Sequence, residues 1–282
     1  MSSVLKDIFN LQKVLNNDDQ VDNYGNIYFH SNERLKDIFS SIDVKDKNVL
    51  TVLASGDQTF YLYDNGAKKV DMYDVNKLAI HYYYLRTWII KYMNVFYPKN
   101  FDVKFIKKIV NKVKPKSMDE KKSLRFWKLF ILFFNNDDLD DLFCYSENPD
   151  LNRIDDLSRI RKGIRNNKIN FFNIDMSGQI DIPNKYHVIF TSNIADYISH
   201  DDQSFKLYRD NIDSLLTDDG IVVCSNVLRG RASILEKEIF LDKFNLEELP
   251  YVENNNFTGA PGYVYKKRML TKNSWHLFSF FI

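Results

Sequence analysis

The sequence has little of several features that mark common protein classes. Only 9 of its 282 residues are glycine, roughly half of what an average usage near 7% would give. Its two cysteines, Cys144 and Cys224, stand 80 positions apart and have no partners at metal-ligand spacing. We therefore expect no metal centre, and a reducing cytoplasm is the expected compartment.

The sequence also has neither an excess of one charge nor a long hydrophobic run. The 39 basic and 38 acidic residues nearly cancel, so no global field points to nucleic acid or to an anionic membrane, although local patches stay open. The first ten residues, MSSVLKDIFN, contain a basic and an acidic residue by position seven and no uninterrupted apolar segment, so no secretory signal is predicted. The most apolar interior run, residues 126–134, contains Lys128 and is far shorter than the ~20 residues of a membrane span. We predict a soluble protein without a transmembrane segment.

Aromatic and aliphatic side chains are abundant. Hydrophobic residues make up 44% of the sequence, with 22 Phe and 17 Tyr, which excludes a disordered chain. The length suits one large domain, or a domain with a sizeable insertion.

The first segment that indicates a particular structure is KNVLTVL at 47–53, which becomes almost continuously apolar from Val49, as in a strand buried on both faces.

Strands and helices alternate after this segment. The strand ends at the turn 54–57 (ASGD), and a helix follows that closes near Gly66. Residues 69–73 predict a second strand, which stops at Asp74. From about residue 77 to residue 97, apolar side chains recur at helical spacing, and we expect the tyrosine rings of this helix to pack inward with His81 exposed.

A long helical stretch then interrupts the alternation. Residues 100–167 carry a basic run, the aromatic segment 126–134 and an acidic cluster, with helical periodicity throughout. We predict a helical insertion there, either a packed structural cap or a lid that shapes an acceptor pocket. Residues 1–45 are predicted as an N-terminal helical segment, and 46–282, apart from the insertion, as one α/β domain.

The sheet pattern resumes beyond the insertion. Residues 169–174, 186–190 and 221–224 predict three strands, with a polar helix over 204–216. Residues 263–270 and 274–282 predict an antiparallel hairpin at one edge of the sheet. The expected fold class is α/β, a doubly wound, mostly parallel seven-stranded sheet with a C-terminal antiparallel hairpin and a helical insertion.

Polar residues follow four of the predicted strands, at the edge where open α/β sheets bind their ligands. From Gly56 to Asp74 is 18 residues, close to the ~20 that separate a glycine turn from a ribose-binding acid. A carboxylate at Asp74 can accept from both hydroxyls of an adenosine ribose. A bare turn at Gly56 would let the backbone approach the rest of that ligand. The other two strand ends carry Asp175 and the pair Ser192 and Asn193.

These strand ends carry a family resemblance. The segments VLTVLASGD (49–57), VDMYDVN (70–76), NID (173–175), YHVIFTSN (186–193) and DDGIVV (218–223) together resemble class I S-adenosylmethionine-dependent methyltransferases. The resemblance covers roughly residues 45–99 and 168–282 and implies a Rossmann-like methyltransferase fold that binds S-adenosyl-L-methionine. More narrowly, VLTVLASGDQ, VDMYDVN and SNIADY are similar to the aminocarboxypropyl transferases that make the betaine-lipid head group.

The resemblance also implies roles for individual residues. The turn would face the methionine moiety, Asp74 would bind the ribose and Val75 would lie against the adenine. Asp175 would accept from the adenine amino group with Met176 beside the ring, and the fourth strand would end beside the sulfonium. The implied cofactor-binding residues are Ala54, Ser55, Gly56, Asp57, Asp74, Val75, Asp175, Met176, Ser192 and Asn193.

Two departures from the family pattern affect the expected chemistry. The usual turn has an acidic residue and two or three glycines, whereas this turn has Gly56 alone. The Asn-Pro-Pro-Tyr signature of amino-directed nucleic-acid methyltransferases is absent after Asn193, so a nucleic-acid acceptor is not expected. Asp196 and Tyr197, just past the fourth strand, are candidates for contacting or deprotonating an acceptor.

The leading functional hypothesis is an S-adenosylmethionine-dependent transferase, most simply a methyltransferase, with a small-molecule or lipid-like acceptor. Transfer of the 3-amino-3-carboxypropyl group is an alternative within the same class. The glycine-poor turn keeps a non-catalytic partner protein of the same fold open. A nicotinamide-dependent dehydrogenase would need a G-x-G-x-x-G turn, which residues 54–59 (ASGDQT) lack.

Overall fold

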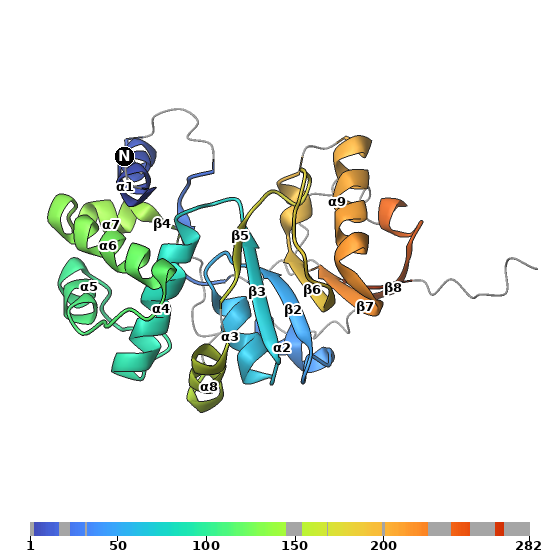
Figure 1. The fold of residues 1–282 in the computed structure, drawn as a ribbon, viewed down its shortest axis with the longest axis horizontal. Helices are drawn as coiled ribbons and strands as arrows, with labels where there is room; N and C mark the ends of the chain where they lie inside the picture. The colour runs from blue at the N-terminus through green and yellow to red at the C-terminus, as the bar shows by residue number, and fades with distance from the viewer. Residues whose placement is uncertain are drawn as a thin grey trace, which may run out of the picture. The chain divides into compact units, whose positions relative to one another are not determined.

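The computed structural model describes residues 3–16, 23–31, 33–144, 154–167, 169–198, 201–224, 238–248 and 263–267. The chain divides into two compact units, Met1–Asp175 and Met176–Ile282, which are called the N-terminal unit and the C-terminal unit below. Figure 1 shows the helices and strands in chain order from blue to red.

Seven strands form a sheet in the order β5-β3-β2-β6-β7-β9-β8. In the N-terminal unit, β2 (Asn48–Val52), β3 (Lys69–Asp74) and β5 (Phe171–Asn173) are parallel. In the C-terminal unit, β6 (Tyr186–Ser192) and β7 (Leu216–Cys224) are parallel, whereas β9 (Tyr263–Lys267) is antiparallel to β7 and to β8 (Phe244–Glu248). The predicted mostly parallel seven-stranded α/β fold is therefore confirmed, antiparallel strands included.

The last described strand begins where the sequence predicts it. β9 starts at Tyr263 and lies antiparallel between β7 and β8. The predicted second strand of the hairpin, residues 274–282, lies outside the described residues. β7 begins at Leu216, earlier than the predicted start at residue 221, and a register shift against β6 accommodates the extra residues.

The first strand and helix of the sheet follow the predicted pattern. Every residue of β2 after Asn48 is buried, as expected for a strand covered on both faces. Helix α3 (Asp57–Asp64) starts directly after Gly56 and ends at Asn65, and the next residue, Gly66, has φ +84°. The amides of Gly66 and Ala67 donate to the carbonyls of Tyr63 and Leu62, so the helix ends in the left-handed conformation that glycine adopts without strain.

Helix α4 (Ala79–Met93) is buried almost all round, with 11 of its 15 residues buried. The prediction that His81 is exposed is wrong, because its side chain is only 4% exposed. The imidazole stacks on Phe126 at 4.2 Å, and its two nitrogens lie 2.9 Å from Ser123 Oγ and 3.3 Å from Asp7 Oδ2. A histidine with polar partners at both nitrogens can be buried in a core at low cost, which helical periodicity alone does not show.

The predicted insertion is helical in its described part. It contains α5 (Val103–Val110), α6 (Met118–Phe133), α7 (Asn136–Leu142) and α8 (Ser158–Asn166). Side chains of Asp102, Ser117 and Asn135 accept from backbone amides at the starts of α5, α6 and α7, as these residue types do at helix N-caps.

Helices α5, α6 and α7 share one hydrophobic core with α1 (Ser3–Leu15) and α4. Trp88, Phe126, Trp127 and Phe130 are among the largest members of this core. A short parallel pair joins β1 (Ile27–Tyr28) to β4 (Phe143–Cys144), and Ile27 and Phe143 belong to the same core. Helix α2 (Leu35–Ser41) lies against α3 instead. Figure 1 shows α1, α5, α6 and α7 on one side of the sheet together with α4.

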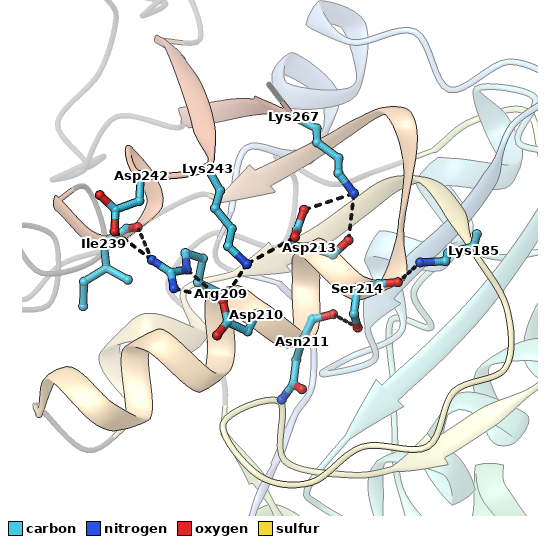
Figure 2. A network of polar contacts seen from close by, with 10 residues as sticks. All are labelled: Lys185, Arg209, Asp210, Asn211, Asp213, Ser214, Ile239, Asp242, Lys243 and Lys267. Carbon is cyan, nitrogen blue, oxygen red and sulfur yellow. Dashed lines mark hydrogen bonds and ion pairs between the residues drawn. The ribbon is translucent and has the colours of Figure 1, made fainter. Parts of the chain in front are cut away.

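An ion-pair network on α9 (Asp202–Leu215) of the C-terminal unit is shown in Figure 2. Arg209 donates to the Asp242 carboxylate at 3.0 Å and to the carbonyl of Ile239 at 3.2 Å. Lys243 bridges Asp210 and Asp213, and Lys267 of β9 pairs with Asp213 at 3.0 Å. The network therefore ties α9 to the segment before β8 and to β9.

Within the described ranges, no helix combines the length and the apolar character needed to cross a bilayer.

Candidate functional site

The backbone of the turn between β2 and α3 is left-handed at two positions. Gly56 has φ +86° and Ala54 has φ +43°, in the left-handed region that side chains with a Cβ seldom adopt. The Gly56 amide donates to the carbonyl of Leu53 at 2.6 Å, which closes the turn. A Cβ at position 56 would lie 3.0 Å from Cδ2 of Tyr83. Glycine is therefore required both by the backbone and by the ring packed against it.

Asp74 lies beside this turn because β2 and β3 pair in parallel, with Val52 opposite Tyr73. Its Oδ2 accepts from the amide of Ala54 at 2.9 Å, and its Oδ1 accepts from the amide of Asn76 at 2.8 Å. Burial raises the pKa of Asp74 to about 6, although the backbone hydrogen bonds oppose this shift. The amide of Val75 is a third backbone donor to this carboxylate. An ionised carboxylate has about four acceptor sites, so acceptor capacity is left for a ligand.

Two neighbours complete the end of β3. Val75 is 45% exposed, which is unusual for an aliphatic side chain directly after a buried strand. Asn173, the last residue of β5, donates from Nδ2 to the carbonyls of Asp74 and Val75, both at 2.8 Å. Asn173 is not among the predicted site residues, and its register with Asp74 is visible only in the structure. Asp175, two residues further on, is exposed.

Asp57, the first residue of α3, is fully buried and belongs to a polar network. Its carboxylate accepts from the amide of Ser31 at 2.7 Å and from the hydroxyl of Tyr97, and it forms an ion pair with Arg86 at 3.0 Å. Burial alone would lower the pKa of Arg86, but the Asp57 carboxylate outweighs it and raises the pKa. The guanidinium is therefore charged and locks the start of α3 to α4.

Aromatic rings surround the same guanidinium. Its central carbon lies 4.4 Å from the ring centroid of Tyr97, 4.9 Å from that of Phe96 and 5.3 Å from that of Phe60. Cation–π contacts of this kind strengthen in a desolvated environment. Arg86 is not among the predicted site residues, although an arginine surrounded in sequence by the apolar and aromatic residues of α4 is a signal that could have found it.

A second buried carboxylate lies next to this network. Glu33 is 4% exposed, and its Oε2 accepts from Gln58 Nε2 at 2.9 Å and from Ser31 Oγ at 3.2 Å. Burial lowers the pKa of neighbouring His30 below its usual 6.5, with Asp57 opposing and Arg86 assisting that shift. His30 and Glu33 therefore contribute titratable groups beside the turn, which their position ahead of the first strand of the seven-stranded sheet did not predict.

The remaining predicted site residues belong to the C-terminal unit. Met176 is buried, and its carbonyl accepts from Asn211 Nδ2 at 2.8 Å. Ser192 ends β6 with φ +56°, and its hydroxyl donates to Asn193 Oδ1 at 3.3 Å. Asp196 lies in the short helix η2 (Ile194–Asp196), and Tyr197 beyond it is 65% exposed.

The predicted residues therefore fall into two groups. The N-terminal unit brings the turn and the end of β3 into direct contact through the Ala54 to Asp74 hydrogen bond, whereas Asp57 faces Arg86 and Tyr97 in the interior. The C-terminal unit holds Met176, Ser192, Asn193, Asp196 and Tyr197.

Comparisons with known proteins find likeness in structure only. No protein family model matches the chain, and a search of curated proteins finds no relative. Among solved structures, the chain is similar to the N-methyltransferase NodS from Bradyrhizobium japonicum in complex with S-adenosyl-L-homocysteine, with 12% identity, 93% of this chain and 98% of that chain covered, and a TM-score of 0.47. It is also similar to a TehB-like S-adenosylmethionine-dependent methyltransferase from Corynebacterium glutamicum, with 11% identity, coverage of 94% and 98%, and a TM-score of 0.41. An rRNA methylase from Streptococcus thermophilus matches with 12% identity, coverage of 83% and 95%, and a TM-score of 0.39.

Proposed function

We propose that the protein is an S-adenosyl-L-methionine-dependent transferase, most simply a methyltransferase. The observation that carries the proposal is Asp74, a carboxylate at the end of β3 whose two oxygens are held by the amides of Ala54 and Asn76. A carboxylate oriented in this way at the end of a parallel strand suits the hydroxyls of a ribose. The sheet order supports the same proposal, because Asp74 ends a strand of an open, mostly parallel sheet, and such sheets bind ligands at the carboxyl ends of their strands.

The surrounding residues fit the adenosine end of this ligand. Val75 is exposed directly beyond the carboxylate, where an apolar side chain can pack on an adenine ring. Asp175 and Met176 are proposed to bind the amino edge and the face of that ring. The turn at Gly56 carries no side chain and would let the backbone approach the methionine moiety.

The protein residues would act mainly by positioning. When bound, the sulfonium of the cofactor supplies an activated carbon, so the chain has to align donor and acceptor and exclude water. Ser192 and Asn193 are proposed to hold the methionine end, and Asp196 and Tyr197 are proposed to contact or deprotonate the acceptor. We propose a small-molecule or lipid-like acceptor and, as the sequence analysis indicates, do not expect a nucleic acid.

Two alternatives follow from the same residues. Attack at the other carbon beside sulfur would transfer the 3-amino-3-carboxypropyl group and release methylthioadenosine instead of S-adenosylhomocysteine. A protein that keeps the fold without catalysis is the second alternative, supported by the single glycine of the turn. Analysis of the thioether product after incubation with candidate acceptors separates all three.

Calorimetry with S-adenosyl-L-methionine tests the proposal. We expect saturable binding that Asp74→Ala weakens by at least about tenfold, since it removes charge-assisted hydrogen bonds to the ligand. Asp137→Ala is the matched control, because Asp137 is an exposed carboxylate on α7. Absence of binding to the wild type, or equal affinity in Asp74→Ala, contradicts the proposal.

A further inference from the structure

Positive charge is concentrated in one part of the N-terminal unit. Residues 103–128 contain ten lysines and arginines against two acidic residues, a local net charge of +8 in a chain whose total is +1. The segment comprises α5, the following loop and most of α6. The basic face is defined here as the exposed side chains Lys104, Lys107, Lys108, Lys112, Lys114, Lys116, Lys121, Lys122, Arg125 and Lys128.

These cations are not used by the fold. Within the described part of the chain, Lys122 is the only one of the ten in an ion pair, with Asp119 at 3.2 Å, and both of those side chains are largely exposed. Surface pairs of this kind contribute little to stability. The basic face is therefore available to an external anion.

Large apolar side chains are also exposed on α6. Met118 is 66% exposed, Leu132 is 73% exposed and Phe133 is 68% exposed. In an α-helix, residues at spacings of three, four and seven share a face, so Met118 and Leu132 lie on the face of Arg125. Phe133 is exposed at the last residue of the helix. The opposite side of α6, with Ser123, Phe126, Trp127 and Phe130, is buried. The outer apolar side chains are thus additional to those that build the core.

We propose that the basic face of α5 and α6, with Met118, Leu132 and Phe133, docks the protein on an anionic phospholipid membrane. Lysine and arginine near such a surface gain electrostatic energy, and adjacent aliphatic and aromatic side chains enter the boundary between head groups and acyl chains. A nucleic acid would be attracted by the same charge, but only Phe133 of the three exposed apolar side chains carries a ring for base stacking. The combination favours the lipid surface.

The acidic residues that follow limit the extent of the contact. Helix α7 carries Asp137, Asp138, Asp140 and Asp141 directly after the exposed Leu132 and Phe133. An anionic surface repels these carboxylates, so the membrane contact covers α5 and α6 and ends before α7. The proposal concerns a surface outside the turn at Gly56 and does not depend on the proposed cofactor.

Vesicle sedimentation without any cofactor tests the proposal. We expect the protein to bind phosphatidylcholine vesicles only when phosphatidylserine is included, and added NaCl to weaken binding. The variant Lys107→Glu/Lys108→Glu/Arg125→Glu/Lys128→Glu should bind at least about 100-fold more weakly, because each basic residue contributes roughly fivefold. The matched control Lys36→Glu/Lys68→Glu/Lys162→Glu/Lys206→Glu makes the same charge change at exposed lysines outside the basic face. Its loss of vesicle affinity, expressed as a logarithm, should be less than half of the loss in the first variant.

A second variant separates insertion from simple charge attraction. Leu132→Ser/Phe133→Ser keeps all ten cations, and we expect it to lose the binding that survives at high salt. If circular dichroism shows that the charge-reversed variant does not fold, the vesicle binding of Leu132→Ser/Phe133→Ser tests the proposal in its place. Equal binding to neutral vesicles, unchanged binding of either variant, or tighter binding of single- or double-stranded oligonucleotides at the same ionic strength would overturn the proposal.

Discussion

The guanidinium of Arg86 and the carboxylate of Asp57 form an ion pair at 3.0 Å in which neither side chain is exposed to solvent. The pair joins the middle of α4 to the first residue of α3, directly after Gly56. Its position makes the conformation of the turn dependent on a residue 29 positions away in the sequence.

The first prediction concerns this pair. We expect Arg86→Met to lower the free energy of unfolding by about 3 kcal/mol or more, because it leaves the Asp57 carboxylate buried without its cation. Urea unfolding measures the change. The double variant Arg86→Met/Asp57→Asn should be less destabilised than the sum of the two single variants. Strict additivity would show that the two groups are not coupled.

The second prediction concerns the conformation of the turn. Gly56→Ala places a Cβ at φ +86° and 3.0 Å from Tyr83, so we expect a loss of about 1 to 3 kcal/mol in stability. If the turn binds S-adenosyl-L-methionine, calorimetry should also show weaker affinity. Gly25→Ala is the control, since a Cβ there meets no atom within 4 Å. Equal stability of the two variants would contradict the requirement for glycine.

The third prediction follows from the titration of Asp74. Its pKa is raised by burial to about 6, and acceptance from two ribose hydroxyls needs the ionised carboxylate. The affinity for S-adenosyl-L-methionine should therefore be constant above pH 7 and fall as the pH drops through about 6. Calorimetry over this range measures the profile. Asp74→Asn should bind more weakly at neutral pH and lose this pH dependence, and a profile shared by both proteins would assign the titration to another group.

The fourth prediction concerns the network in Figure 2. Arg209 is only 8% exposed, and it holds the carbonyl of Ile239 as well as the carboxylates of Asp210 and Asp242. We expect Arg209→Met to destabilise the protein by about 1 to 2 kcal/mol in thermal or urea unfolding. Lys185→Met should change stability by less than about 0.5 kcal/mol, because Lys185 is exposed and contacts only the carbonyl of Ser214 among the partners drawn in that figure.

The sheet could be predicted from the sequence because its local signals agree with its packing. The buried run from Val49, the turn at Gly56 and the short strand before Asp74 each carry periodicity or turn chemistry that neighbouring residues reinforce. The partner of β9 could not be predicted, because strand pairing depends on which edge is free and not on local pattern.

The polar interior of the candidate site was harder to predict for a related reason. Arg86, Glu33 and Asp57 are buried because each finds a partner from a distant segment, and the apolar periodicity of a helix assigns no partners. His81 was misplaced on the surface for the same reason, since its burial depends on Ser123 and Asp7. Local pattern predicts which residues are apolar and inside, whereas long-range pairing decides which polar residues join them.

The short pairing of β1 with β4 has a consequence for how the protein is made. The amide of Phe29 donates to the carbonyl of Cys144, and the carbonyl of Phe29 accepts from the hydroxyl of Tyr82, two residues before Ser31 reaches Asp57. A nascent chain has the turn and its first two sheet strands long before residue 144 emerges from the ribosome. Residues 29–31, which contact Asp57, can form their hydrogen bond with Cys144 only after residue 144 has been made. The order of synthesis therefore delays the final packing around the turn until α5, α6 and α7 have been synthesised.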